Sequence, residues 1–271
     1  FIILNGCENS ARIEIIVSEN ACSTQRQVAA ELQHYLSKMY PDQIFSVAES
    51  VTSDEFILLA KVAELKNEPF NTIEAKFEGF ALPASGEGFS IKGTEKDSKK
   101  MALICGCDER GLMYAVYDLL EKLGCRFYLS TEFIPKYDNN ADISTWDVIN
   151  EPLASKRIVF NWHNFLSGCS GWDFEEYKQG IDGAAKMKYN SIMLHAYGNN
   201  PMYNFSYNGA EKPHGYMANT NRGRDWGTQH VNDVQNLIGG EIFDEAVFGS
   251  EASKVPEQEV KKAAVGLMHD V

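Results

Sequence analysis

The sequence predicts an α/β fold divided between two domains. Segments of β-branched and other apolar residues alternate along the chain with segments whose apolar residues recur at helical spacing. A stretch rich in Asp, Asn and Pro interrupts this pattern, which then starts again with a strand, a helix and a strand. Such alternation is typical of layered α/β proteins.

The first domain is predicted to be a small α/β sandwich, a sheet with two helices packed on a face. The expected strands are Arg12–Ser18, Glu55–Lys61, Gly88–Thr94, Met101–Gly106 and 125–130. One expected helix spans 25–39, with Ser23 or Thr24 as its N-cap. The other spans 112–124, with Gly124 as its C-terminal cap.

The turn between the fourth strand and the second helix contains two glycines, Gly106 and Gly111, as a phosphate-binding loop would. Leu112 and Met113 stand where such a loop needs Lys and Ser or Thr, and no GxGxxG motif occurs in this part of the chain. A small doubly wound nucleotide-binding enzyme is therefore the least favoured class.

Three regions follow from the pattern: an N-terminal α/β domain over 1–132, a linker over 133–152, and a second domain over 153–271. The second domain begins with a strand at Arg157–Phe165, continues with a helix, and reaches a second strand at 190–197. A strand, a helix and a strand at this spacing predict one right-handed crossover with parallel strands.

Composition excludes some partners. The formal net charge of -13 and the pI near 4.9 disfavour nucleic acid and anionic lipid, because the long-range field repels both. No apolar run approaches the roughly 20 residues of a membrane span. The six cysteines match no zinc spacing, and most are expected to be small buried apolar residues. We expect no metal and no cofactor.

The first seven residues, FIILNGC, have two interpretations. They are a short strand that turns at Asn5-Gly6, or they are the end of a signal peptide followed by a cysteine, Cys7, that carries lipid. The expected location is extracellular or periplasmic, with attachment to a bacterial outer membrane under the second interpretation.

Two segments resemble a known domain. IVSENACSTQRQVAAELQHYLSKM and, later, LICGCDERGLMYAVYDLLEKLGCRFYLS are similar to the small α/β domain that precedes the catalytic barrel of α-glucuronidases, β-hexosaminidases and α-N-acetylglucosaminidases. The cues are the AAxELxxYL helix and the RGxxYAVYxLLExLGxRFY segment. The continuation over 161–197 resembles the first βαβ unit of their (β/α)8 barrels. The resemblance implies a glycoside hydrolase with a small α/β domain followed by an incomplete (β/α)8 barrel.

In such a barrel the active site lies at the carboxyl ends of the strands. Aromatic rings there stack on sugars, while Asn and His exchange hydrogen bonds with hydroxyls. The candidate substrate-binding residues are Asn161, Trp162, His163, His195, Tyr197, Asn199, Arg224, Trp226 and Glu251. Structural roles stay open: His195 as a core residue, Trp162 as a plug between domains, Asn199 as a turn residue, and Arg224 as part of a solvated loop.

The catalytic carboxylate pair is not identified. Residues 157–271 are fewer than half of the about 250 residues of a complete barrel. The chain is therefore expected to be the N-terminal portion of a glycoside hydrolase that acts on poly- or oligosaccharides, inactive alone. Two open parallel strands would otherwise self-associate with another copy. The alternative is a non-catalytic carbohydrate-binding or scaffold module.

Overall fold

The computed structural model describes residues 12–67, 70–74, 76–82, 84, 86–161, 174–194 and 206–211. The chain forms two compact units. The first comprises Phe1–Ser155 with Lys186–Lys188, and the second comprises Lys156–Ala185 and Tyr189–Val271. No helix in the described ranges has both the length and the apolar character that crossing a bilayer requires.

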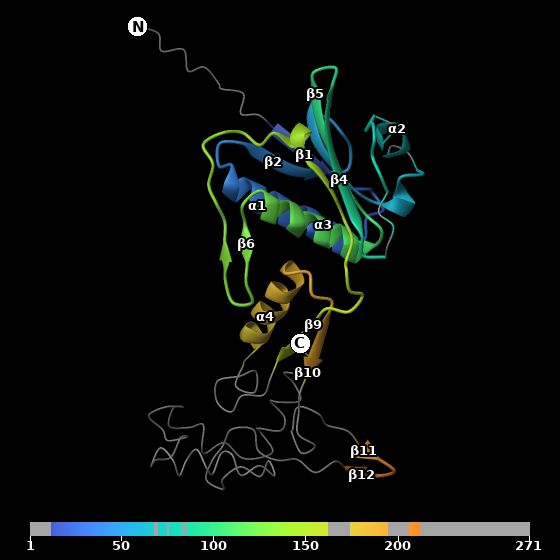
Figure 1. The fold of residues 1–271 in the computed structure, drawn as a ribbon, viewed down its shortest axis with the longest axis vertical. Helices are drawn as coiled ribbons and strands as arrows, with labels where there is room; N and C mark the ends of the chain where they lie inside the picture. The colour runs from blue at the N-terminus through green and yellow to red at the C-terminus, as the bar shows by residue number, and fades with distance from the viewer. Residues whose placement is uncertain are drawn as a thin grey trace. The chain divides into compact units, whose positions relative to one another are not determined.

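The first unit is built on a six-stranded sheet (Figure 1). Its strands, in spatial order, are β2 (Ile44–Ala48), β1 (Arg12–Ile16), β3 (Glu55–Lys61), β5 (Lys99–Gly106), β4 (Phe89–Lys96) and β8 (Asp147–Asn150). β1, β2, β3 and β5 pair in parallel, whereas β4 runs antiparallel to both of its neighbours. The predicted α/β fold class is confirmed.

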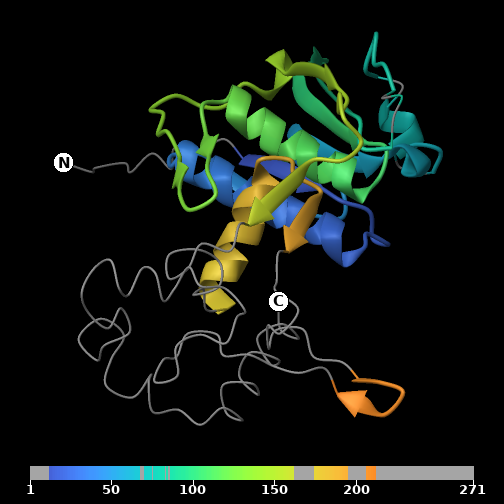
Figure 2. The same ribbon diagram turned by 60° about the horizontal axis from the view of Figure 1, so that its bottom comes forward.

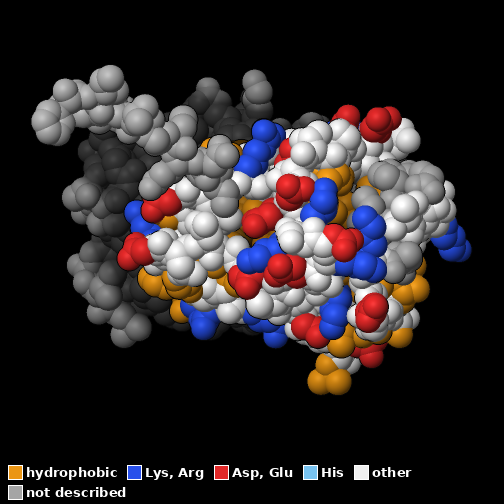
Figure 3. Space-filling model, turned by 90° about the horizontal axis from the view of Figure 1, so that it is seen from above, with side chains coloured by type: hydrophobic (Ala, Val, Ile, Leu, Met, Phe, Trp, Pro, Cys, Tyr) orange, Lys and Arg blue, Asp and Glu red, His pale blue; other side chains and the backbone are white. Residues whose placement is uncertain are grey.

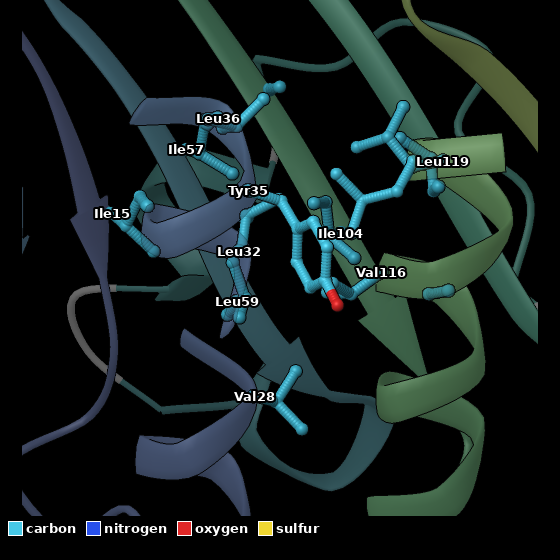
Figure 4. Packing of buried hydrophobic residues seen from close by; sticks show 14 of the residues in the cluster. Ile15, Val28, Leu32, Tyr35, Leu36, Ile57, Leu59, Ile104, Val116 and Leu119 are labelled. Atoms are coloured by element: carbon cyan, nitrogen blue, oxygen red, sulfur yellow. The ribbon is translucent and has the colours of Figure 1, made fainter. Parts of the chain in front are cut away.

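Two helices cover one face of this sheet, as predicted. α1 (Ser23–Met39) and α3 (Glu109–Lys122) lie side by side in both ribbon views (Figures 1 and 2). Their apolar stripes meet alternate residues of the strands in one buried cluster (Figure 4). Its members include Ile15, Val28, Leu32, Tyr35, Ile57, Leu59, Ile104, Val116 and Leu119.

A second apolar cluster covers the opposite face of the sheet. The strand residues that alternate with the first set point into it, among them Phe56, Leu58 and Leu103. The connection from β3 to β4 covers them with η1 (Val62–Glu64) and α2 (Phe70–Glu74). The central strands are therefore buried on both faces, which explains their nearly continuous apolar character.

The two helices that cover the sheet, α1 and α3, both begin with local hydrogen bonds. Asp108 Oδ1 accepts from Gly111 N at 2.7 Å, so α3 begins at Glu109, earlier than its apolar stripe indicates. Gly124, at φ +108°, ends it as predicted: Cys125 N donates to Leu120 O at 2.9 Å in a Schellman motif. The N-cap of α1 is Cys22, not Ser23 or Thr24.

The segment predicted as the last strand of the sheet forms a separate hairpin. Among the described strands, β6 (Arg126–Phe127) pairs with β7 (Glu132–Phe133) in a sheet of two strands. Phe127 is buried edge-on against Tyr35, with ring centroids 5.5 Å apart, whereas Tyr128 and Leu129 are both exposed. The apolar run 127–129 therefore does not lie on the sheet.

Part of the segment predicted as a linker belongs to the sheet. Within 133–152, η2 (Ile143–Thr145) leads into β8, which pairs with Phe89–Lys92 of β4. The first compact unit accordingly extends to Ser155. Sequence pattern missed this strand because three of its four side chains are exposed, so no apolar alternation marks it.

The second unit contains the predicted strand-helix-strand crossover. β9 (Ile158–Asn161), α4 (Phe174–Lys186) and β10 (Ser191–Leu194) follow in that order, and the two strands pair in parallel. A two-stranded antiparallel hairpin, β11 (Ser206–Tyr207) and β12 (Ala210–Glu211), lies further along the chain.

A buried carboxylate, Glu14 of β1, holds the turn before β3. Its side chain is 1% exposed and accepts hydrogen bonds from Thr52 N at 2.7 Å, Ser53 N at 2.9 Å and Thr52 Oγ1. Burial alone would raise the pKa of Glu14, but these hydrogen bonds and the charge of Arg12 lower the pKa below its ordinary value. The charged form is therefore the one that the fold stabilises.

Replacing Glu14 by glutamine is expected to lower the free energy of unfolding at pH 7 by about 1.5–3 kcal/mol, because an amide group would face donors. Since the folded-state pKa is depressed, the carboxylate stabilises the fold above its ordinary pKa, and this stabilisation is lost as pH falls through the folded pKa. Urea unfolding at successively lower pH, starting from about pH 5, should therefore bring the stabilities of wild type and Glu14→Gln together. Glu19→Gln, on an exposed residue, is the control, and a parallel decline of all three proteins would contradict the assignment.

Candidate functional site

The carboxyl ends of β9 and β10 lie level with each other. Asn161 pairs with Leu194 in the parallel register, so the residues after each strand leave the two-stranded sheet at the same edge. The parallel direction predicted for these segments is confirmed. It is the geometry that a site built from strand-to-helix loops requires.

Hydrogen bonds at the opposite end of the two strands hold this register. Asn190 Oδ1 accepts from Arg157 N at 2.9 Å, and Asn190 N and Ser191 N both donate to Arg157 O, at 3.0 and 3.2 Å. Asn190, which precedes β10, is thus hydrogen-bonded to Arg157, which precedes β9. A slip of one residue would break these bonds and move each side chain to the other face.

Of the nine predicted substrate-binding residues, Asn161 lies within the described residues and the other eight do not. Asn161 is the last residue of β9, and the structure places its backbone beside Leu194. The others lie outside the described residues: Trp162, His163, His195, Tyr197, Asn199, Arg224, Trp226 and Glu251. Trp162 and His195 directly follow the paired strand ends in sequence. The roles of all nine residues stay predictions.

One face of the β9–β10 sheet is apolar and exposed. Ile158, Phe160 and Met193 are 41%, 44% and 48% exposed, and the register places Met193 beside Phe160. Residues two apart on a strand share a face, so these three side chains form one surface. Three large apolar side chains together are a surface suited to burial against further chain.

The carboxyl ends of the parallel strands in the first unit are a second place where a ligand could bind, because ligands of open parallel sheets bind beyond the carboxyl ends of the strands. Lys61, the last residue of β3, donates to Glu109 Oε1 at 2.7 Å. That hydrogen bond is the main cause that raises the pKa of Lys61 and lowers the pKa of Glu109. Glu64 Oε2 accepts from Gln25 Nε2 and from Lys61 N, both at 2.8 Å. These polar groups satisfy one another across α1, β3, η1 and α3, which is the pattern of a structural network.

Two of the four described thiols are buried, as expected of small apolar residues, whereas Cys22 and Cys107 are partly exposed. Cys105 and Cys125 are buried, and burial raises the pKa of Cys125 to about 11. Burial, followed by the charges of Asp108 and Glu151, also raises the pKa of Cys107. The thiols of Cys107 and Cys125 therefore stay protonated near neutral pH, and neither is an activated nucleophile. Cys7 and Cys169 lie outside the described residues.

The described surface carries mixed charge. On the face shown in Figure 3, acidic and basic side chains are interspersed. Ion pairs such as Lys92–Asp147 and Lys99–Asp54, each at 2.7 Å, join strands or turns of the sheet. Within the residues that the structure describes, no group of three or more His, Cys, Asp and Glu side chains is placed to hold a metal ion.

Tyr207, an exposed aromatic residue, is not among the predicted site residues. Tyr207 precedes the turn of the β11–β12 hairpin and is 74% exposed. The signal that could have found it is the Asn208-Gly209 pair, the strongest short-range sign of a two-residue hairpin. The surrounding stretch has little helical or strand periodicity, so the sequence pattern by itself indicates a long loop there.

Comparison with known families supports the predicted resemblance. Residues 5–119 match the model of the glycosyl hydrolase family 67 N-terminus. The matched range includes α1, the sheet strands from β1 to β5, and most of α3. The first unit therefore resembles the N-terminal α/β domain of glycoside hydrolases, as the sequence motifs predict. No curated protein matches the chain.

Three solved structures that the chain matches are those of glycoside hydrolases. A family 115 4-O-methyl-α-glucuronidase with specificity for decorated arabinogalactans shows 13% identity and a TM-score of 0.49 over 68% of this chain. A family 20 β-N-acetylhexosaminidase from Streptomyces coelicolor A3(2) shows 16% identity and a TM-score of 0.41, also over 68%. A β-hexosaminidase from Streptomyces plicatus shows 16% identity and a TM-score of 0.42 over 69%. The chain covers 25% of the first of these proteins and 30% of the other two.

Proposed function

We propose that this chain is the N-terminal portion of a glycoside hydrolase that cleaves glycosidic bonds of poly- or oligosaccharides. The observation that supports this most directly is the order of its parts. A domain that matches the glycosyl hydrolase family 67 N-terminus precedes a parallel β9–α4–β10 crossover whose strand ends are level. The first domain serves as a scaffold, and β9 and β10 are the first two strands of a catalytic (β/α)8 barrel.

The exposed face of β9 and β10 supports the same proposal. In a closed barrel, each strand pairs on both sides and alternate side chains fill the interior. One face of the β9–β10 sheet carries Ile158, Phe160 and Met193. These side chains have the size and polarity of residues that fill a barrel interior. We propose that further βα units bury this face. A second copy of the chain, pairing through the open strands, is the competing arrangement.

The residues at the strand ends have distinct proposed roles. Trp162, Tyr197 and Trp226 stack on sugar rings. Asn161, His163, His195 and Asn199 exchange hydrogen bonds with hydroxyl groups. Arg224 pairs with a carboxylate of the sugar, as a uronic acid offers, and Glu251 accepts hydrogen bonds from hydroxyl groups. The catalytic carboxylates come from later strands, so residues 1–271 alone are inactive. The proposed location is extracellular or periplasmic.

The proposal is tested with two proteins, residues 1–271 and the product of the coding sequence with the further βα units. Both are assayed on aryl uronides and aryl N-acetylhexosaminides. We expect hydrolysis by the longer protein only, and a large loss of kcat/KM in its Trp162→Ala variant. Carbohydrate binding by the longer protein without hydrolysis of any aryl glycoside would favour the non-catalytic module instead.

The arrangement of β9 and β10 is tested separately by the oligomeric state. The longer protein is expected to be monomeric in light scattering, because its own strands cover Ile158, Phe160 and Met193. Residues 1–271 are expected to self-associate, and Phe160→Asp is expected to weaken that association because it places a charge on the apolar face. A longer protein that dimerises through this face, with Phe160→Asp monomeric and folded, would contradict the closed barrel.

A further inference from the structure

The β11–β12 hairpin is a short, defined structure in the stretch that follows β10. Asn208 and Gly209 form its two-residue turn, with φ of 49° and 80°. Positive φ at both positions is what a type I′ turn requires, and Asn-Gly is the pair that adopts it most readily. The flanking residues pair across the hairpin as Tyr207 with Ala210 and Ser206 with Glu211. The turn therefore determines on which face each flanking side chain lies.

The hairpin presents the Tyr207 ring to solvent. At 74% exposed, Tyr207 has the largest exposed fraction of any aromatic side chain in the described ranges. Its cross-strand partner is Ala210, and residues 206–210 are all exposed. A methyl group opposite the ring leaves its faces uncovered, whereas hairpins are stabilised by larger cross-strand partners. Packing within the hairpin does not account for a tyrosine at this position.

The place of the hairpin in the chain connects it with the strand ends. The chain leaves β10 at Leu194, which is level with Asn161, and the hairpin begins at Ser206 within the same compact unit. It therefore belongs to the connection that starts at the carboxyl end of the second strand. Connections of this kind form the walls of the active site in (β/α)8 barrels.

We propose that Tyr207 is a sugar-binding residue whose ring stacks on a pyranose unit of an oligosaccharide substrate, away from the bond that is cleaved. This inference rests on the proposed function and adds a substrate-positioning residue to it. An aromatic ring offers a large rigid face and a hydroxyl group at its edge, which suits a sugar ring with apolar C–H faces and polar rims. The type I′ turn fixes the backbone beside Tyr207, so the face of the hairpin that carries the ring is set before substrate arrives, which reduces the entropic cost of binding.

The test uses the protein with its complete catalytic domain and two probes, a glucuronoxylo-oligosaccharide and triacetylchitotriose. Wild type, Tyr207→Ala, Tyr207→Trp and Tyr128→Ala are compared. Tyr128 is the control, since it is an exposed tyrosine of the first unit. For the probe that wild type hydrolyses, Tyr207→Ala should raise KM about tenfold, the loss expected for one aromatic face against a ligand, with a smaller change in kcat. Tyr207→Trp should keep KM near wild type, and so should Tyr128→Ala.

The outcomes separate this inference from the proposed function. Hydrolysis by wild type together with an unchanged KM in Tyr207→Ala would overturn the role of Tyr207 and leave the hydrolase intact. If wild type hydrolyses neither probe, calorimetry with the same two oligosaccharides decides on Tyr207, and the proposed function fails only when the aryl glycosides also stay uncleaved. Binding that weakens about tenfold in Tyr207→Ala and is kept in Tyr207→Trp would support it. Absence of binding by wild type, or equal binding by all four proteins, would overturn it.

Discussion

Replacing Gly106 by alanine is expected to destabilise the first unit by about 4 kcal/mol or more, a large part of the stability of a typical domain. Gly106 ends β5, and a Cβ atom there would lie 2.1 Å from Leu112 N and 2.6 Å from Gly111 C. Both atoms belong to the backbone of the first turn of α3, so no side-chain rotation relieves the overlap. α3 would have to move away from the sheet that it covers.

The matched control for this substitution is Gly86→Ala. A Cβ atom at Gly86 would meet nothing within 4 Å, and its backbone is not in the left-handed region. Alanine there should leave the free energy of unfolding within about 0.5 kcal/mol of wild type or raise it slightly. Urea unfolding followed by circular dichroism checks both variants. Equal stability of Gly106→Ala and Gly86→Ala would show that α3 does not approach β5 as closely as described.

The close approach of α3 to Gly106 also explains why two glycines occur in this turn although it is not a phosphate-binding loop. Gly106 and Gly111 have the positions of glycines in a phosphate loop, without the residues that bind phosphate. In the structure Gly106 allows close packing of β5 against α3, and a Cβ atom on Gly111 would lie 2.6 Å from Gly88 O. Glycine in a strand-to-helix turn therefore serves helix–sheet packing here.

The parts of the fold that sequence predicted well are those with a buried face. β3 was predicted with its observed bounds, and both α1 and α3 show apolar stripes that face the sheet. β8 was missed because backbone hydrogen bonds to β4, and not buried side chains, place it in the sheet. β6 was misplaced because Phe127 packs against Tyr35 instead of joining the sheet.

Some features of the candidate site can also be predicted from the sequence, and others cannot. The parallel direction of β9 and β10 follows from the length of the crossover and from apolar residues in succession, and it was predicted. The register that pairs Asn161 with Leu194 depends on the hydrogen bonds between Asn190 and Arg157. No periodic pattern in the sequence indicates these bonds. The exposure of Tyr207 depends on the small partner opposite it, which only the hairpin register reveals.

Replacing Tyr35 by alanine is expected to lower the free energy of unfolding by about 3–5 kcal/mol, the range for removing a buried aromatic side chain. Tyr35 is among the largest fully buried residues. Its ring points from α1 toward Ile104 of the sheet and Val116 of α3 (Figure 4). Its ring meets Phe127 edge-on, and its hydroxyl donates to Glu132 Oε2 at 2.5 Å. The substitution would leave a cavity in the core and would remove one of the two rings, Tyr35 and Tyr117, that pack against Phe127 of the β6–β7 hairpin.

Tyr35→Phe separates the ring from the hydroxyl group. Burial, and then the hydrogen bond to Glu132, raises the pKa of Tyr35, so the hydroxyl is protonated and able to donate at neutral pH. Losing that donor should cost about 1–2 kcal/mol, less than losing the ring. Tyr128→Ala, at a residue 54% exposed beside the same hairpin, should change stability by at most about 0.5 kcal/mol. Thermal and urea unfolding of the three variants measure the order. A Tyr35→Phe cost equal to that of Tyr35→Ala would mean that the hydrogen bond, and not packing, joins the hairpin to the core.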